Sequence, residues 1–317
     1  MPRRERIEGP AAVTVEDIDR INRVFSEAFT DRYQRDGMSG VRVPHLNPAI
    51  WRFAIAAAGE GAMQWRDASG GIVAFNMVHH CGTEGWMGPL AVVPGHQGQG
   101  IGGLIVEAGI RWLQARGARV IGLETMPRTV DNIGFYSRLG FRPGHLTVSV
   151  TRDLEAAPVP LGTLLSLEDR TAAIRACGVL TEALLPGTDF SREMALTLEL
   201  GLGDATLLRD PAGLAGFALW HSAPLAEGKP VDEVRVLKLA ARDRAVFPQL
   251  IQAVEASGWA RGGRRIAIRC QTAYVGAYGA LLDAGYRVHW TDLRMTLDGE
   301  PEKTAPWDGV VFSNWEI

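Results

Sequence analysis

A glycine-rich turn follows a short apolar run in the first half of the chain and has the residues to bind a phosphate group. The segment LAVVPGHQGQGIGG spans residues 90–103, and the helical spacing of apolar residues starts at Ile101. The four glycines within residues 98–103 allow positive φ angles and a close approach of backbone N–H groups to a ligand. The first N–H groups of a helix lack partners, and the helix dipole favours an anion there. The segment therefore predicts a site for a phosphorylated ligand.

The same glycines also match the dinucleotide fingerprint G-x-G-x-x-G. Glu124 lies 21 residues after Gly103, close to the distance expected for the acidic residue of that fingerprint. In a dinucleotide-binding fold the strand leads almost directly into the first glycine. Here residues 94–97 intervene, and Pro94 ends the strand early. This spacing favours a different phosphate-binding fold.

A second block, NIGFYSRLGF at residues 132–141, follows about 35 residues downstream. Residues 97–102, QGQGIG, fit the pattern Q-x-x-G-x-G. With the two blocks in this order, the chain resembles the GNAT superfamily of acyl-CoA-dependent N-acetyltransferases. The resemblance covers residues 14–152 and, in outline, residues 162–298. It implies an α/β fold in which a mixed sheet is sandwiched by helices, and acetyl-CoA as the co-substrate.

The resemblance also implies roles for individual residues. The strand before the turn would pair with the pantetheine arm through its main chain, the glycine turn would hold the pyrophosphate, and the downstream helix would place an asparagine near the cofactor and a tyrosine near its sulfur. The implied cofactor-binding residues are Leu90, Ala91, Val92, Gln97, Gly98, Gln99, Gly100, Ile101, Gly102, Gly103, Asn132 and Tyr136. Tyr136 is the implied general acid, since a phenol with a pKa near 10 can protonate a leaving thiolate.

Acetyl transfer to an amine also needs a proton acceptor, because a protonated amine is not a nucleophile. Glu124 matches the glutamate that ribosomal-protein N-terminal acetyltransferases use, although it lies eight residues before Asn132, a longer spacing than in those enzymes. We therefore expect Tyr136 and Glu124 to be the catalytic residues. Glu84 and a water chain are the alternatives for the base.

The elements that must position these residues follow from the apolar periodicity. We expect helices over residues 16–33, from residue 101, and over 132–139, and strands over 62–65, 72–78, 86–93, 120–125 and 146–151, the last closing the sheet. The acceptor pocket is expected in residues 30–51, which have a loop-like composition. Alternating helices and strands predict the α/β class.

The second half of the chain repeats the first in outline. ARGARVI at residues 115–121 recurs as ARGGRRI at 260–266, and GFR at 140–142 recurs at the same distance as GYR at 285–287. GIVAF at 71–75 recurs as GLAGF at 213–217. We therefore predict tandem GNAT domains at residues 1–155 and 156–317, joined by an alanine- and proline-rich linker at 155–160 and followed by an aromatic C-terminal tail.

The repeat indicates that the second copy has lost the cofactor site. The stretch equivalent to Gln97–Gly102 is Arg242–Phe247, which contains no glycine, and Phe247 stands in place of Gly102. The positions of Glu124, Asn132 and Tyr136 are occupied by Arg269, Ala277 and Leu281. We expect one competent site, in the first half, and an apolar interface through which the second half docks.

The overall composition excludes several other functions. A net charge of −3 without a lysine- and arginine-rich stripe gives no support for nucleic acid binding. The sequence shows neither a signal peptide nor an apolar run of membrane-spanning length, so we expect a cytoplasmic protein without a membrane partner. We expect no metal site. The three cysteines are scattered, and a strand would point the side chains of the two adjacent histidines to opposite faces.

These observations predict an acetyl-CoA-dependent N-acetyltransferase in which the amine attacks the thioester directly. The acceptor is an amine of a small molecule or peptide, which the sequence does not identify further, and an oligomer is left open. The alternative is a non-catalytic acyl-CoA-binding sensor or scaffold module. Both would bind acyl-CoA, but only the enzyme needs Tyr136 and an open acceptor cleft.

Overall fold

The computed structural model describes residues 7–156, 162–299, 301–306 and 308–315. The first half contains six strands and four α-helices within these residues: β1 (Glu8–Ala12), α1 (Ile18–Arg35), α2 (Pro48–Ala58), β2 (Ala62–Arg66), β3 (Ile72–Cys81), β4 (Glu84–Val92), α3 (Ile101–Gln114), β5 (Val120–Thr125), α4 (Val130–Arg138) and β6 (Phe141–Asp153). Residues 157–160 of the expected linker lie outside the described residues, and the domain boundary stays a prediction.

The second half repeats this order of elements. Its members are β7 (Thr163–Leu164), α5 (Arg170–Leu184), α6 (Ser191–Glu199), β8 (Gly203–Asp210), β9 (Gly213–His221), β10 (Glu233–Ala241), α7 (Val246–Ala260), β11 (Arg265–Gln271), α8 (Val275–Asp283), β12 (Arg287–Leu297) and β13 (Val310–Ser313). Helix α7 begins 145 residues after α3, strand β11 begins 145 residues after β5, and helix α8 begins 145 residues after α4. This is the offset of the sequence repeat.

Helix α2 was not expected from the sequence. Residues 30–51 were interpreted as loop-like, but the helix starts at Pro48 and includes Trp51, which is fully buried. Its start has a clear local cause, because Asn47 Oδ1 accepts a hydrogen bond from the Ala49 N–H at 3.0 Å and Pro48 occupies the first helical position. The loop-like interpretation was therefore wrong for residues 48–51.

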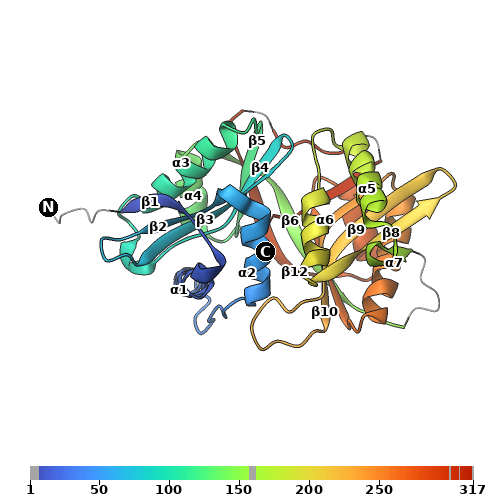
Figure 1. Ribbon diagram of the computed structural model, residues 1–317, viewed down its shortest axis with the longest axis horizontal. Coiled ribbons are helices and arrows are strands. Elements are labelled where there is room, and N and C mark those ends of the chain that lie inside the picture. Colours follow the sequence, from blue (N-terminus) through green and yellow to red (C-terminus); the bar gives the residue numbers. More distant parts are fainter. Residues whose placement is uncertain (1–6, 157–161, 300, 307, 316–317) are drawn as a thin grey trace.

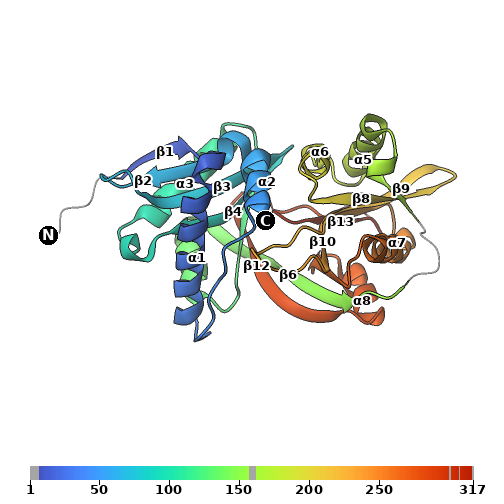
Figure 2. The ribbon, with the colours of Figure 1, turned by 60° about the horizontal axis from the view of Figure 1, so that its bottom comes forward.

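All described strands belong to one mixed sheet that runs through both halves (Figure 1). Its order is β1-β2-β3-β4-β5-β12-β6-β11-β10-β9-β8-β7, with β13 paired to β10. Strand β12 of the second half inserts between β5 and β6, and β6 in turn pairs with β11. The two halves have thus exchanged their long last strands, which lie side by side between them in Figure 2. The expectation that residues 146–151 close the first half's sheet was wrong, because β12 takes that place.

Helices cover both faces of the sheet in each half. Along β3, Phe75 and Met77 pack in one cluster with α1 and α2, whereas the alternating Ala74 and Val78 pack in another with α3. Successive side chains of a strand point to opposite faces, so the two clusters lie on opposite sides of the sheet. Helices α5 and α7 likewise pack in separate clusters in the second half. The result is the α/β sandwich with a mixed sheet that the sequence predicts.

The halves are joined by more than apolar contacts. Strand pairing crosses between them, and a buried group of charged side chains lies at the crossing: Glu124, Arg269, Asp292, Arg294 and Glu302. The expected apolar interface was therefore incomplete. The exchanged strands carry charged side chains to the centre of the sheet, where Glu124 of β5 pairs with Arg269 of β11 and Arg294 of β12. Arg269 also pairs with Asp292, and Arg294 with Glu302 in the segment after β12.

Candidate active site

The glycine turn has the backbone shape that the sequence predicts. After a short 3₁₀ turn at Pro94–His96, Gly98 has φ 75° and Gly100 has φ 88°. A Cβ atom built on either glycine would meet nothing within 4 Å, so the turn faces open space. The Gln97 side chain holds the turn to the preceding strand by donating from Nε2 to the Val92 carbonyl at 3.0 Å. This cradle at the start of α3 fits a pyrophosphate group.

The strand before the cradle has an open edge. β4 pairs with β5 over Glu84–Met87, and beyond that point the two strands separate. Leu90, Ala91 and Val92 pair with β3 on their other side. Among the described residues no strand pairs with their β5-facing edge, so a ligand lying between β4 and β5 can hydrogen-bond to the main chain as an added strand would.

Helix α4 directs Asn132 and Tyr136 toward this gap. Both side chains line the cavity described below, and Asn132 Nδ2 donates to Thr125 Oγ1 at 3.4 Å. Tyr136 is only 6% exposed and packs against Phe135 and Phe141. Burial raises the pKa of the Tyr136 hydroxyl above its ordinary value. Tyr136 therefore keeps its proton at neutral pH.

A cavity of about 410 Å³ opens beside these residues and has walls from both halves of the chain. The first half contributes α1, the loop after it, β4, β5 and α4, and the second half contributes the β9–β10 loop and β12. The two loops are fastened to each other: Leu46 bridges to Ala226, and the Asn47 N–H donates to the Leu225 carbonyl at 2.9 Å. The second half thus supplies part of the wall.

Glu124 lies on the cavity wall but is held in ion pairs. Its side chain is 5% exposed and is bound by Arg269 and Arg294, both from the second half, and by the Thr147 hydroxyl at 2.6 Å. Burial alone would raise the pKa of Glu124, but the two guanidinium groups and the Thr147 hydrogen bond outweigh it and hold the pKa below its ordinary value. Glu124 is consequently a weak proton acceptor.

Glu84, the alternative base, is placed elsewhere. It is buried, accepts from Trp86 Nε1 at 3.1 Å, and lines a small separate cavity together with Tyr274 and Glu302. Burial and the neighbouring Glu302 raise the pKa of Glu84. Its position outside the Tyr136 cavity leaves it without access to an amine bound there.

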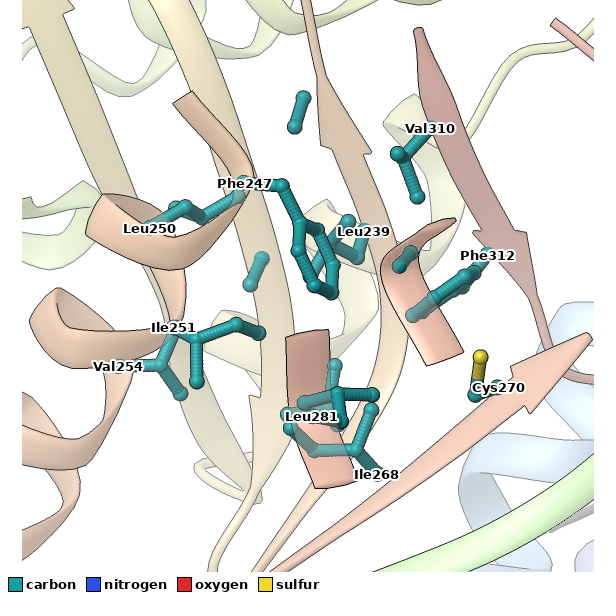
Figure 3. Packing of buried hydrophobic residues seen from close by; sticks show 14 of the residues in the cluster. Leu239, Phe247, Leu250, Ile251, Val254, Ile268, Cys270, Leu281, Val310 and Phe312 are labelled. Carbon is teal, nitrogen blue, oxygen red and sulfur yellow. The ribbon is translucent and has the colours of Figure 1, made fainter. Parts of the chain in front are cut away.

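In the second half the edge equivalent to Leu90–Val92 is covered by the chain itself. β10 pairs with β11 over Glu233–Val236 and then with β13, from Lys238 opposite Ser313 to Ala241 opposite Val310. Phe312 of β13 packs against Phe247, with ring centroids 5.7 Å apart (Figure 3). Phe247 is the residue that replaces Gly102. The space that could receive a cofactor in the first half is filled here by β13 and aromatic rings.

Two aromatic residues of the C-terminal tail, Phe312 and Trp315, pack on the protein. Phe312 is fully buried and Trp315 is 8% exposed, whereas Trp307 lies outside the described residues. Ala277 and Leu281, at the positions of Asn132 and Tyr136, are buried in the same cluster as Phe247. The residues that lack functional groups in the second half therefore serve as core.

The sequence interpretation missed the second half's contribution to the cavity and its wall. Trp290 and Asp292 line the cavity, and Arg269 and Arg294 bind Glu124 behind it. One signal was present in the repeat, because Arg269 occupies the position equivalent to Glu124. Trp290 and Asp292 carry no such signal.

Comparison with known proteins identifies the class. Residues 25–141 match the acetyltransferase (GNAT) family. The whole chain superposes on a putative acetyltransferase from Pyrococcus horikoshii, with a TM-score of 0.67, 16% identity and coverage of 99% of this chain and 95% of that one. A tandem GNAT protein from the clavulanic acid biosynthesis pathway superposes with a TM-score of 0.58 and 14% identity, covering 94% of this chain and 100% of that one. Residues 25–141 thus match the GNAT family, and the chain as a whole has the fold of tandem GNAT proteins.

The fold also extends to a more distant class of acyltransferase. Saccharomyces cerevisiae N-myristoyltransferase with bound myristoyl-CoA superposes with a TM-score of 0.64 and 10% identity, covering 95% of this chain and 84% of that one. Members of the GNAT family are acyltransferases, and the family and fold support acyl-CoA-dependent acyl transfer in general. Among the described residues, no helix is both long and apolar enough to cross a bilayer, and no group of three metal-ligating side chains comes together.

Proposed function

We propose that the chain is an acetyl-CoA-dependent N-acetyltransferase with one catalytic site, in its first half. The observation that carries the proposal is the pairing of an open β4 edge with the glycine cradle, next to a cavity lined by Asn132 and Tyr136. The pyrophosphate would lie on residues 97–103 and the pantetheine arm along Leu90–Val92. The acetyl group would then lie near Tyr136.

The proposed chemistry assigns separate tasks to the side chains. The acceptor amine attacks the thioester carbonyl, whose developing negative charge is stabilised by main-chain N–H donors of β4. Tyr136 gives its proton to the departing thiolate. Glu124, the expected base, has its proton affinity lowered by Arg269 and Arg294, and we assign it the task of holding these two arginines behind the cavity wall.

The number of cofactor sites and turnover test the proposal together. Calorimetry should give one acetyl-CoA per chain, because the equivalent edge in the second half is occupied by β13. Thiol release from acetyl-CoA should then depend on an added amine. Two equivalent binding sites would contradict the single-site assignment. One site without turnover on any amine would favour the alternative, a non-catalytic acyl-CoA-binding module.

Replacement of Tyr136 separates binding from chemistry. Tyr136→Phe should lower kcat by roughly 10²-fold while the Kd for acetyl-CoA stays within a few fold, because the hydroxyl acts only during transfer. Steady-state kinetics and calorimetry on the same variant provide both values. Tyr278→Phe, a partly buried tyrosine on α8 of the second half, is the matched control and should leave both values unchanged. Equal losses in kcat and affinity for Tyr136→Phe would show that Tyr136 is a packing residue.

A further inference from the structure

The cavity contains two carboxylates among its described lining residues, Glu124 and Asp292, and they differ in what binds them. Glu124 is enclosed by two arginines and a threonine hydroxyl. Asp292 has one arginine near it: Oδ2 lies 3.0 Å from Arg269 Nη1 but has no well-aligned hydrogen bond. Arg269 is shared with Glu124, so Asp292 is the less neutralised of the two.

Asp292 is also placed where a bound amine can reach it. It lies on β12, opposite Thr147 of β6, and its Oδ1 accepts a hydrogen bond from Trp290 Nε1 at 3.2 Å. The Trp290 ring faces Tyr33 of α1, with the ring centroids 6.1 Å apart. A carboxylate beside two aromatic rings is a favourable site for an ammonium group, through an ion pair and cation–π attraction.

The electrostatic surroundings of Asp292 favour proton uptake. Burial raises the pKa of Asp292, Arg269 of β11 lowers it, and the negative charge of Glu124 on β5 raises it again, so that it lies above its ordinary value. The other charged groups lining the cavity are Arg32 and Arg42, on α1 and the loop after it. Glu124 has its pKa shifted in the opposite direction. The two carboxylates are therefore suited to different tasks.

The remaining walls indicate the body of the acceptor. They are mainly apolar and come from α1, the loop after it, β4 and the β9–β10 loop, and they include Phe25, Phe29, Val43, Met87, Leu90 and Leu225. The cations of the described lining are Arg42 and Arg32, and Arg32 pairs with Asp36 and Asp131. A second ammonium group on the acceptor would therefore find no carboxylate of its own in the lining and would lose its hydration against apolar walls.

The following inference rests on the proposed function. We propose that Asp292 binds the acceptor's ammonium group and takes up its proton, and that the acceptor is a primary monoamine whose remaining part is apolar. An N–H bond of the ammonium breaks and an O–H bond forms on Asp292. The neutral nitrogen attacks the thioester carbon, the C–S bond breaks, and Tyr136 protonates the thiolate. The second proton lost by the nitrogen returns to Tyr136 and the Asp292 proton leaves to water, so one proton is released per turnover.

Asp292→Asn tests the base directly, with 2-phenylethylamine as the acceptor. We expect kcat to fall roughly 10²-fold, the Kd for acetyl-CoA to stay within twofold, and the acidic limb of the kcat–pH profile to disappear. Asp292→Glu should recover at least about a tenth of the wild-type kcat, since the carboxylate is restored. Asp298→Asn, an exposed aspartate just beyond β12, is the matched control and should behave as wild type. An unchanged kcat and pH profile in Asp292→Asn would overturn the assignment.

A measurement on the wild-type protein keeps the proposal testable if the buried substitution prevents folding. The value of kcat/KM for 2-phenylethylamine should exceed that for putrescine by at least about tenfold, because putrescine brings a second positive charge into the cavity. Preference for putrescine would overturn the inference, although acetyl-CoA binding and amine-dependent turnover would still support the proposed function. Absence of binding and of turnover on both amines would instead contradict the proposed function.

Discussion

Gly100→Asp is expected to abolish acetyl-CoA binding at working concentrations. The substitution places a carboxylate at the start of α3, where the pyrophosphate would lie, at a residue with φ 88°. Two unit charges 4 Å apart repel by about 4 kcal/mol at an effective dielectric constant near 20, and even half of this raises the Kd about 30-fold. A non-glycine side chain at this φ adds strain. We therefore expect the Kd from calorimetry to rise by at least about 10²-fold.

The chain offers a closely matched control for this experiment. Gly117 follows the other end of α3, has φ 80°, and would place a Cβ atom in open space, as Gly100 does. Gly117→Asp thus repeats the charge and the backbone strain away from the cradle, and the Kd should stay within about twofold. If both variants bind acetyl-CoA as the wild type does, the pyrophosphate lies elsewhere.

Arg294→Met is expected to produce the largest loss of stability. Arg294 is 1% exposed, binds Glu124, binds Glu302 at 2.6 and 2.9 Å, and stacks over Trp86. Removal of one partner from a buried ion pair leaves the other charge without compensation, which costs about 3–5 kcal/mol. The urea-unfolding midpoint should fall accordingly. Arg142→Met, which breaks an exposed pair with Asp298, should change the free energy of unfolding by less than about 1 kcal/mol.

The pH dependence of this loss identifies its cause. The pKa of Glu124 is held below its ordinary value, so its ion pairs stabilise the fold above the unfolded-state pKa, about 4.3, and this contribution is lost as the pH falls through the folded-state pKa. Without Arg294, burial should raise the pKa of Glu124, and the deficit of the variant should shrink between pH 7 and pH 5. A deficit that does not change with pH would point to lost packing on Trp86 instead.

Local signals were sufficient to predict the elements that carry the proposed cofactor-binding residues. The glycine turn, β5 and α4 each depend on neighbouring residues, and β5 spans Val120–Thr125 as expected. The missed helix α2 also had a local signal, in Asn47 followed by Pro48. The loop-like composition of the residues before Asn47 nevertheless favoured the interpretation as a loop. Strand β1 was not expected either. The limits of the expected helices and strands of the first half differ from the observed ones by a few residues, except at β6, whose pairing with β11 and β12 extends it to Phe141–Asp153.

The amine side of the cavity could not be predicted from local patterns. Whether Glu124 acts as a base depends on Arg269 and Arg294, which lie 145 and 170 residues away in the sequence. Their arrival depends on which strand lies between β5 and β6, and apolar periodicity does not distinguish one amphipathic strand from another. The same exchange brings Asp292 to the cavity.

The exchanged strands also set the order in which the molecule can be completed during synthesis. β5 has its edge partner only once Arg287–Leu297 has been made, although the first half's own last strand ends at Asp153. At translation rates of roughly 5–20 residues per second, the intervening residues take roughly 7–30 s to emerge. Glu124 lacks Arg269 for most of that interval and Arg294 until its end, and the strand edge destined for β12 is exposed to other chains. The cavity is therefore among the last features of the protein to form, and a chain that stops short of β12 lacks one of its walls.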